Sequence, residues 1–393
     1  MSIRVRASRF RSSFMGLSNA AKRRARSLTD FSGSASFRFR RQVNYYKVQC
    51  NFLQPKTQGI THKTSMQSDQ KSAKKAVSTG RLAPSPTGGL HLGNARTFLF
   101  AWLLARHSGG RMIFRMEDLD ATRARDEAAA AAIEDLRWIG LTWDEGPDVG
   151  GPAGPYVQSQ RSVHYQNALD LLIEKEVVYP CTCTRADVAR AASAPHAGEN
   201  ASVYPGTCAA LSAAAGLEYQ SHGRSFSWRF RTSGRVVNWY DFVLGPQRHE
   251  MAATGGDFII ARSGSIYSYQ LAVVVDDALM GVNQVVRGSD LVESTPRQIL
   301  VQEALGFSRP EYWHLGLVLD SSHKRLAKRD QSVKIAAFKG EQDSADRLGR
   351  ILKASLGWDD SFWSQQAPEN FSEAIMDWKK HGLTLDCEWV WSQ

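Results

Sequence analysis

Apolar and polar positions alternate with two different periods between residues 81 and 310, and each period is typical of one kind of element. Apolar residues three and four positions apart predict helices. These helices cover 94–107, 126–140, 162–175 and 295–307. Short apolar runs bounded by turn residues predict buried strands between them. Because strands and helices alternate, this pattern predicts an α/β fold with a mainly parallel sheet.

The pattern changes between 181 and 256, where cysteines and turn-forming residues precede strand-like stretches at 225–234 and 236–245. Alternation of β-rich runs and a helix resumes with DFIIARSGSIYSYQLAVVVDDALMG and VNQVVRGSDL. We therefore predict an inserted module within a core that continues after it. The predicted parts are a basic, disordered targeting segment (1–79), the first half of the core (80–180), the inserted module (181–256), the second half of the core (257–310), and a basic loop with a short helical region (311–393).

The formal net charge of +10 is concentrated at one end of the chain. Residues 1–80 hold 17 Lys and Arg against two Asp, whereas residues 81–393 hold 32 basic and 37 acidic residues. The first segment is rich in Arg and Ser and lacks the apolar stretch of a secretory signal, which is typical of an organellar transit peptide. A basic arm that binds RNA, or untranslated sequence before a true start at Met66, are the alternatives. The predicted location is a mitochondrion or plastid under the first interpretation and the cytoplasm otherwise.

The segment RLAPSPTGGLHLGN, residues 81–94, combines an Arg, a glycine pair and a His within reach of one anionic ligand. Gly88 and Gly89 allow the backbone to approach a ligand where side chains would collide. The helix that follows directs free N–H groups and the positive end of its dipole to the same place. His91 can donate a hydrogen bond to a phosphate oxygen there. The loop therefore predicts a phosphate site, although a strand-to-helix turn with an incidental His gives the same short pattern.

Polar residues follow two of the apolar runs. GRMIF leads to Arg115, Glu117, Asp118 and Asp120, and LAVVV leads to Asp276 and Asp277. Polar residues at the carboxyl ends of parallel strands face a ligand crevice in open α/β sheets. We expect both groups at this sheet edge, although an acidic pair at a helix N-terminus accounts equally well for the second.

Five cysteines occur in the chain, and three of them cluster in the predicted inserted module. These are Cys181, Cys183 and Cys208. Because no secretory signal accompanies them, metal binding is favoured over disulfides. Buried free cysteines are the alternative.

Five segments resemble, in this order, the catalytic domain of glutamyl-tRNA synthetases over residues 80–355. They are RLAPSPTGGLHLGNART, FRMEDLD, YSYQLAVVVDD, VVRGSDL with STPRQ, and HKRLAKRD. The chain is most similar to short paralogues in this family, which lack an anticodon-binding domain and attach glutamate to a queuosine base in the anticodon of tRNA(Asp). The resemblance implies a Rossmann-like nucleotide-binding core, an inserted zinc-containing acceptor-end module and a short helical C-terminal stem-contact region.

The resemblance also implies that glutamate is activated as glutamyl-adenylate by ATP with Mg²⁺. The α-carboxylate attacks the α-phosphorus, so positive charge and fixed donors must offset the repulsion between two anions. His91 and Asn94 match the polar positions of the family's HIGH-like motif, and Gly93 keeps the floor open beneath the adenosine. Lys328 matches the KMSKS loop that closes over pyrophosphate. The loop departs from the common pattern at three positions, Arg325, Ala327 and Arg329.

Glutamate carries two carboxylates and an ammonium group, so its pocket needs cationic and anionic side chains. By resemblance, Arg81 and Arg287 bind the carboxylates, Glu117 binds the ammonium, and Tyr269 supplies a hydroxyl and a ring wall. The residues that line the loop beside them are Ala83 and Ser85. Taken singly, each has a structural explanation, since a Tyr in an apolar strand is more often core and such an Arg more often forms a surface salt bridge.

The pattern C-x-C followed by Y-x-x-x-C resembles the zinc site of the short paralogues. It comprises Cys181, Cys183, Tyr204 and Cys208. The resemblance implies one structural zinc ion per chain, held by three thiolates and a phenolate. The stretch between Cys183 and Tyr204 is longer than the family pattern, and His196 and His222 are nearby substitutes for Tyr204.

Three functions remain open from the sequence. The first is an ATP-dependent ligase that transfers glutamate to queuosine in tRNA(Asp). The second is an organellar glutamyl-tRNA synthetase with a reduced C-terminus that charges tRNA(Glu); such enzymes generally need tRNA before they form adenylate, whereas the short paralogues do not. The third is a catalytically silent RNA-binding module, against which the intact His91, Glu117, Arg287 and Lys328 argue. We expect a monomer without a membrane segment, since no apolar run approaches the length of a membrane span.

Overall fold

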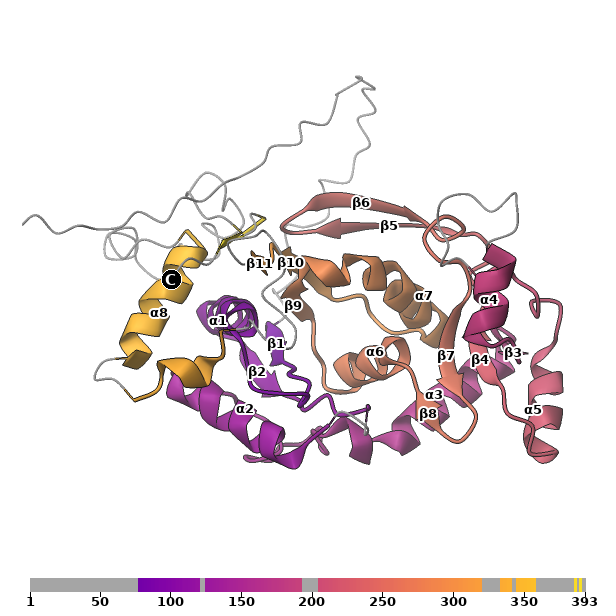
Figure 1. The fold of residues 1–393 in the computed structure, drawn as a ribbon, viewed down its shortest axis with the longest axis horizontal. Helices are drawn as coiled ribbons and strands as arrows, with labels where there is room; N and C mark the ends of the chain where they lie inside the picture. The colour runs from indigo at the N-terminus through magenta and orange to yellow at the C-terminus, as the bar shows by residue number, and fades with distance from the viewer. Residues whose placement is uncertain are drawn as a thin grey trace, which may run out of the picture. The chain divides into compact units, whose positions relative to one another are not determined.

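The computed structural model describes residues 77–120, 124–192, 204–319, 333–340, 344–357, 385–386 and 389–390, without the side chains of 189–192 and 389–390. All of them belong to one compact unit, 48–393. Figure 1 shows the arrangement of their helices and strands.

Parallel strands form the core sheet, and their residues are almost entirely buried. They are β1 (Thr79–Leu82), β2 (Arg111–Phe114), β9 (Gln284–Gly288) and β10 (Glu311–Leu315). β1 pairs with β2, and β9 pairs with β10. The Asn283 N–H donates to the Thr79 carbonyl at 3.1 Å, which places β9 beside β1. Such burial is expected for parallel strands covered on both faces, and the pairing confirms the predicted α/β class.

Helices connect and cover these strands (Figure 1). The main ones are α1 (Leu92–His107), α2 (Asp126–Trp138), α3 (Ser162–Glu174), α6 (Tyr269–Leu279) and α7 (Thr295–Leu305). The four helices predicted from apolar periodicity are confirmed, each within two residues at either end. α7 ends where Gly306 adopts a φ of +76°, a conformation that costs glycine little.

A second, antiparallel sheet contains β3 (Val178–Cys181), β4 (Ser227–Phe230), β7 (Phe258–Arg262) and β8 (Ile266–Tyr267). Around it lie α4 (Arg185–Ala192) and α5 (Ala213–Ser221). The hairpin of β5 (Val236–Asp241) and β6 (Gly245–Glu250) instead joins the core sheet, because Asp241 stands opposite Tyr312 of β10. The segment predicted as one inserted module, 181–256, therefore spans two sheets.

The last described elements are short. The strands β11 (Val318–Leu319) and β12 (Trp389–Val390) pair in parallel. The helix α8 (Ser344–Ser355) packs on α1 and confirms the helical pattern predicted there. Short 3-10 helices are η1 (Gln158–Gln160), η2 (Ser289–Ser294) and η3 (Ile335–Phe338). None of the helices in the described ranges is long and apolar enough to cross a membrane.

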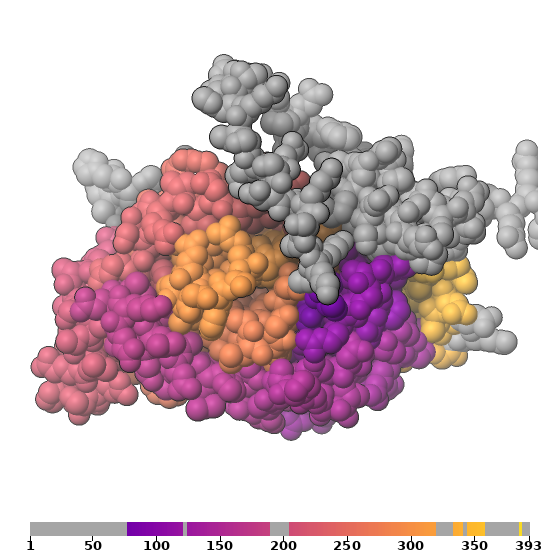
Figure 2. Space-filling view, turned by 180° about the vertical axis from the view of Figure 1, so that it is seen from behind, coloured from indigo at the N-terminus to yellow at the C-terminus, as the bar shows by residue number. Residues whose placement is uncertain are grey.

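Two apolar clusters fill the interior, one around α1 and one around α6 and α7. Seen from behind, the surface of the α6 to α7 segment, in orange, adjoins that of the first core segment, in indigo and purple (Figure 2). Asp276 and Asp277 lie between these parts, in the second half of α6, and are 0% and 6% exposed. Both predicted positions for this pair, at a sheet edge or at a helix N-terminus, are wrong. A helix buried on all sides is apolar all round, so its sequence resembles that of a buried strand.

Candidate active site

His91 is the N-cap of α1, and its imidazole takes part in a reciprocal cap. Nδ1 accepts hydrogen bonds from the backbone N–H groups of Gly93 at 3.1 Å and Asn94 at 3.4 Å. In return, Asn94 Oδ1 accepts from the His91 N–H at 3.3 Å. A neutral imidazole that accepts at Nδ1 carries its proton on Nε2. The cap therefore makes Nε2–H the ring donor, at the positive end of the α1 dipole.

The glycines of this loop have different explanations. A Cβ added at Gly93 would lie 3.0 Å from Cε1 and 3.1 Å from Nδ1 of His91, so a side chain there would displace the imidazole. At Gly88, by contrast, an added Cβ would meet no atom of the described residues within 4 Å. Packing therefore explains Gly93, whereas no contact with the described part of the chain explains Gly88.

Both flanks of the predicted KMSKS-like loop adjoin α1. After the loop, the Val333 carbonyl accepts a hydrogen bond from the Leu92 N–H at 3.2 Å. Before the loop, the Cβ of Val318 lies 3.8 Å from where a Cβ at Gly93 would stand. The loop therefore starts and finishes beside the predicted phosphate site. Lys328, its predicted catalytic residue, lies outside the described residues.

Glu117 lies against the loop that follows β1, because its N–H donates to the Pro84 carbonyl at 2.9 Å. Its carboxylate accepts a hydrogen bond from Arg115 at 3.0 Å. Burial raises the pKa of Glu117 above its ordinary value, and the charges of Arg115 and Arg81 only partly offset this effect. The loop residues beside Pro84 are Ala83, which is half-buried, and Ser85, which is exposed.

Arg81 points from β1 toward β9 and is 5% exposed. Its Nη1 donates to the Val286 carbonyl at 3.0 Å, and its Nε lies 3.6 Å from a carboxylate oxygen of Asp277. That Nε has no hydrogen-bond partner among the described residues. This buried atom faces the Asp277 carboxylate, so the ion pair with Asp277 compensates its charge.

Arg287 and Tyr269 also come together, with 3.5 Å between the Arg287 Nη1 and the Tyr269 hydroxyl. The other side of the guanidinium is held by protein groups, since Nη2 donates to Thr295 at 2.7 Å and Nε donates to His314 at 2.9 Å. His314 and Thr295 are not among the predicted site residues, although Thr295 lies in the STPRQ segment. The structure thus brings the predicted glutamate-binding residues together from β1, α6, β9 and the loops that follow β1 and β2.

A buried ionic cluster lies behind these residues. Arg115 is fully buried and donates to Asp277 at 2.7 Å as well as to Glu117. Asp276 accepts from Arg161 at 2.6 Å, and its remaining bonds come from Gln158 and Tyr165. Buried charges are tolerated when they are paired and hydrogen-bonded. Asp277 and Asp276 of α6 therefore fix Arg115 and Arg161 next to the site.

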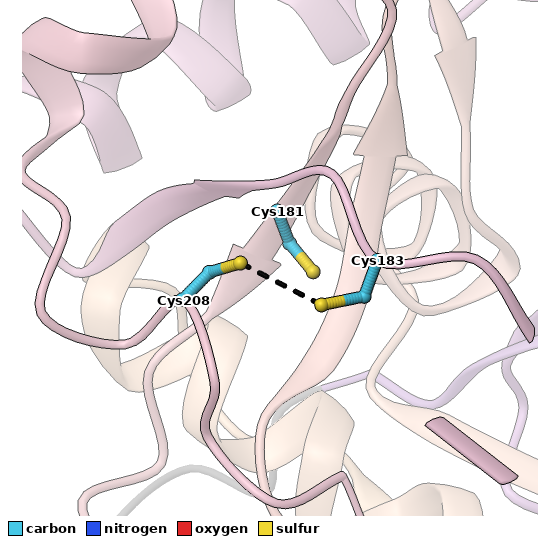
Figure 3. Close-up of side chains that lie close together, drawn as sticks. All are labelled: Cys181, Cys183 and Cys208. Atoms are coloured by element: carbon cyan, nitrogen blue, oxygen red, sulfur yellow. Dashed lines mark hydrogen bonds between the residues drawn. The ribbon is translucent and has the colours of Figure 1, made fainter. Parts of the chain in front are cut away.

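The three cysteines meet at the end of β3, and their side chains converge in Figure 3. The Cys183 and Cys208 sulfurs are 3.6 Å apart. The Tyr204 hydroxyl lies 3.3 Å from the Cys181 sulfur and 3.8 Å from that of Cys183, and it accepts from the Cys208 N–H at 2.9 Å. Of the two substitutes, His222 instead bonds the Glu218 carbonyl at 2.9 Å, and His196 lies outside the described residues.

The match to known families agrees with this arrangement. A family model described as the catalytic domain of class I tRNA synthetases (E and Q) matches residues 76–379, more than half of the chain. The chain belongs to this family. Its parallel core sheet and the loops that follow β1 and β2 are thus those of a class I synthetase catalytic domain.

Three relatives show which members of the family this chain resembles. The glutamyl-Q tRNA(Asp) synthetase of Nitratidesulfovibrio vulgaris is 50% identical over 278 residues, covering 71% of this chain and 86% of that protein. The glutamyl-Q tRNA(Asp) synthetase of Symbiobacterium thermophilum is 50% identical, covering 68% and 83%. The glutamate–tRNA ligase of the same organism is 40% identical, covering 71% of this chain and 58% of the ligase.

A solved structure shares the fold. It is a glutamate tRNA ligase from Elizabethkingia meningosepticum in complex with its amino acid, with a TM-score of 0.57 and 27% sequence identity. The match covers 70% of this chain and 53% of the ligase, so the chain spans about half of that protein.

Proposed function

We propose that this chain activates glutamate with ATP and Mg²⁺ and transfers it to the queuosine base of tRNA(Asp). In the first step an α-carboxylate oxygen bonds to the α-phosphorus and pyrophosphate leaves, giving glutamyl-adenylate. In the second step a hydroxyl of the queuosine cyclopentenediol attacks the glutamyl carbonyl carbon, loses its proton, and AMP leaves. The observation that carries this proposal is that two buried arginines, Arg81 and Arg287, lie with Tyr269 and Glu117 beside the loop that leads to the N-cap residue His91.

His91 is assigned to the ATP phosphates. Its Nε2–H is fixed by the cap as a donor, and such a preorganised donor favours charge that develops in the transition state. Gly93 leaves room for the imidazole, and Asn94 holds the capping geometry. Lys328 is assigned to the pyrophosphate, and the position of both loop flanks beside Gly93 supports this assignment.

Glutamate is assigned to the space between the arginines. Arg81 and Arg287 would bind its carboxylates, Glu117 its ammonium, and Tyr269 would contribute its hydroxyl. The hydrogen bond from Arg81 to the Val286 carbonyl, next to Arg287, supports this assignment, because it holds two cationic side chains near each other. Ala83 and Ser85 border the space from the loop after β1.

Zinc is assigned to Cys181, Cys183, Tyr204 and Cys208 as a structural ion. A tetrahedral zinc ion about 2.3 Å from each sulfur requires sulfurs about 3.8 Å apart. The Cys183 and Cys208 sulfurs, 3.6 Å apart, are close to this requirement, and all three sulfurs lie within 4.8 Å of one another. The Tyr204 hydroxyl lies 3.3 Å and 3.8 Å from the sulfurs of Cys181 and Cys183, near enough to share one ion with them. The guanidinium of Arg229 stands over the Tyr204 ring at 3.7 Å, so a positive charge faces the anionic ligand set. When bound, zinc would tie β3 to the segment around Cys208.

Sequence identity favours tRNA(Asp) over tRNA(Glu) as the acceptor. The chain is 50% identical to each of the two glutamyl-Q tRNA(Asp) synthetases but 40% identical to the glutamate–tRNA ligase. The deciding experiment offers radiolabelled glutamate and ATP to tRNA(Asp) with queuosine, tRNA(Asp) without it, and tRNA(Glu). We expect label only on the first. Label on tRNA(Glu) alone would overturn this proposal.

A further inference from the structure

Arg287 is held from behind by a buried hydrogen-bonded row that crosses three strands. His314 of β10 stands directly opposite Arg287 of β9. The imidazole Nε2 lies 2.9 Å from the Arg287 Nε, and Nδ1 lies 2.5 Å from a carboxylate oxygen of Asp241 at the end of β5. His314 and Asp241 are both 0% exposed. The row therefore runs from the β5–β6 hairpin to an arginine in the proposed glutamate site.

The chemistry of the two end groups fixes the tautomer of the His between them. An arginine Nε–H can only donate, and an ionised carboxylate can only accept. Nε2 of His314 must therefore be the bare nitrogen, and Nδ1 must carry the proton. Burial lowers the pKa of His314; the hydrogen bond to Asp241 opposes this effect and the charge of Arg287 adds to it, and the net lowering agrees with the neutral ring that the hydrogen bonds require. Although burial raises the pKa of Asp241, hydrogen bonds from His314 and two backbone N–H groups lower it on balance.

This arrangement leaves one edge of the guanidinium for a ligand. Nε is used by His314, and Nη2 donates to Thr295 at 2.7 Å. Nη1, on the other side, lies 3.5 Å from the Tyr269 hydroxyl, a long separation for a hydrogen bond. A rigidly held Arg with a directed free edge binds a carboxylate at less entropic cost than a mobile one.

We propose that His314 and Asp241 are positioning residues for glutamate recognition, which act by orienting the guanidinium of Arg287. This inference rests on the proposed function, and it assigns to the β5–β6 hairpin a part in amino-acid selection. Asp241 also accepts from the Val243 and Leu244 N–H groups at 2.9 Å, so the hairpin turn and the site share one carboxylate.

The test compares two replacements of His314 that each keep one of its hydrogen bonds. An Asn amide reaches about as far as Nδ1 and retains the bond to Asp241, whereas a Gln amide reaches about as far as Nε2 and retains an acceptor for Arg287. Glutamate-dependent pyrophosphate exchange is measured for the parent, His314→Asn and His314→Gln. We expect kcat/KM for glutamate to fall about ten- to a hundredfold in His314→Asn, as for a lost hydrogen bond to a charged group. The expected result for His314→Gln is recovery of most of that loss, with the KM for ATP unchanged in both.

Tyr312→Phe is the matched control on the same strand. The Tyr312 hydroxyl bonds Gln302 at 3.1 Å, away from Arg287, and the replacement keeps the ring beside the guanidinium. We expect its glutamate KM to stay within about twofold of the parent, because the deleted bond lies outside the row. Equal losses of kcat/KM for glutamate in His314→Asn, His314→Gln and Tyr312→Phe would show that His314 has a merely structural role, and would overturn the inference.

A second readout does not depend on activity. In protein labelled with ¹⁵N-histidine, NMR should show His314 with a proton on Nδ1 and a bare Nε2 at neutral pH. A proton on Nε2 would overturn the positioning role. An active parent with unchanged glutamate kinetics in His314→Asn would overturn this inference alone, whereas a parent without glutamate-dependent exchange would overturn it together with the proposed function.

Discussion

Replacement of Arg115 by Met removes the positive centre of the buried cluster, while Met retains a comparable side-chain length. Arg115 is 0% exposed and donates to Asp277 at 2.7 Å and to Glu117 at 3.0 Å. Breaking a buried ion pair from one side costs about 3–5 kcal/mol, because a charge is left without compensation. In the variant, Asp277 still has Arg81 3.6 Å away as a partner. We therefore expect the free energy of unfolding to fall by about 3 kcal/mol, the lower end of that range.

The loss should depend on pH. Burial already raises the pKa of Glu117, and without Arg115 only Arg81 would oppose this effect. A carboxyl whose pKa is raised in the folded protein binds its proton more tightly there than in the unfolded chain. The loss of folding stability due to Glu117 is therefore largest at a pH above its raised pKa. It disappears as the pH falls below the ordinary carboxyl range of about 4 to 4.5.

Urea denaturation at a pH of about 7.5 and at about 5 measures both effects. Arg235→Met is the matched control, since Arg235 pairs with Glu303 at 2.7 Å at the surface and both side chains are more than a third exposed. Its expected cost is below about 1 kcal/mol at either pH. A loss in Arg115→Met that equals the control, or that does not shrink on acidification, would refute the account of this cluster.

Three further predictions concern the ligand sites. In exchange assays, His91→Ala should lower the rate of glutamate activation about 10²- to 10³-fold, and in denaturation experiments it should destabilise the fold by about 1 kcal/mol. His91→Asn should lower the activation rate similarly but keep the helix cap and the stability. An active His91→Asn enzyme would contradict the assignment. Cys183→Ser should lose bound zinc in metal analysis, and retention of stoichiometric zinc would exclude this ligand set. The KM for glutamate should rise as pH falls through the raised pKa of Glu117, because a protonated carboxyl cannot pair with the substrate ammonium; a KM independent of pH down to about 4 would count against that role.

Local periodicity predicted the helices of the core because helix formation follows from neighbours three and four residues apart. The same reasoning placed Asp276 and Asp277 wrongly, since their partners Arg115 and Arg161 are more than a hundred residues away in the sequence. Nothing in the periodicity of a helix buried over 271–277 indicates which distant arginines will contact it.

The hydrogen-bonded row behind Arg287 could not be predicted from local periodicity either, although the sequence contains one signal that part of it is buried. In β5, every second residue is buried, and this face carries Val237, Trp239 and Asp241. An acidic residue at the third apolar position predicts a buried partner, because buried carboxylates are paired or hydrogen-bonded. The sequence does not say that the partner is His314, since that pairing depends on how the hairpin joins β10.

The residues of the proposed glutamate site could be predicted through resemblance, because they lie in segments with family motifs. Thr295 and Arg115 lie in such segments too, but their supporting contacts could not be predicted, since these join separate elements. Lys328 remains a prediction, and the contacts of Val333 and Val318 with α1 are its structural support.

Glutamate-dependent exchange of labelled pyrophosphate into ATP, without any RNA, tests the activation site most directly. The account predicts exchange by the parent with glutamate, strong loss in Lys328→Ala, and little exchange with aspartate. Exchange that is absent without RNA, or that Lys328→Ala leaves unchanged, would contradict it.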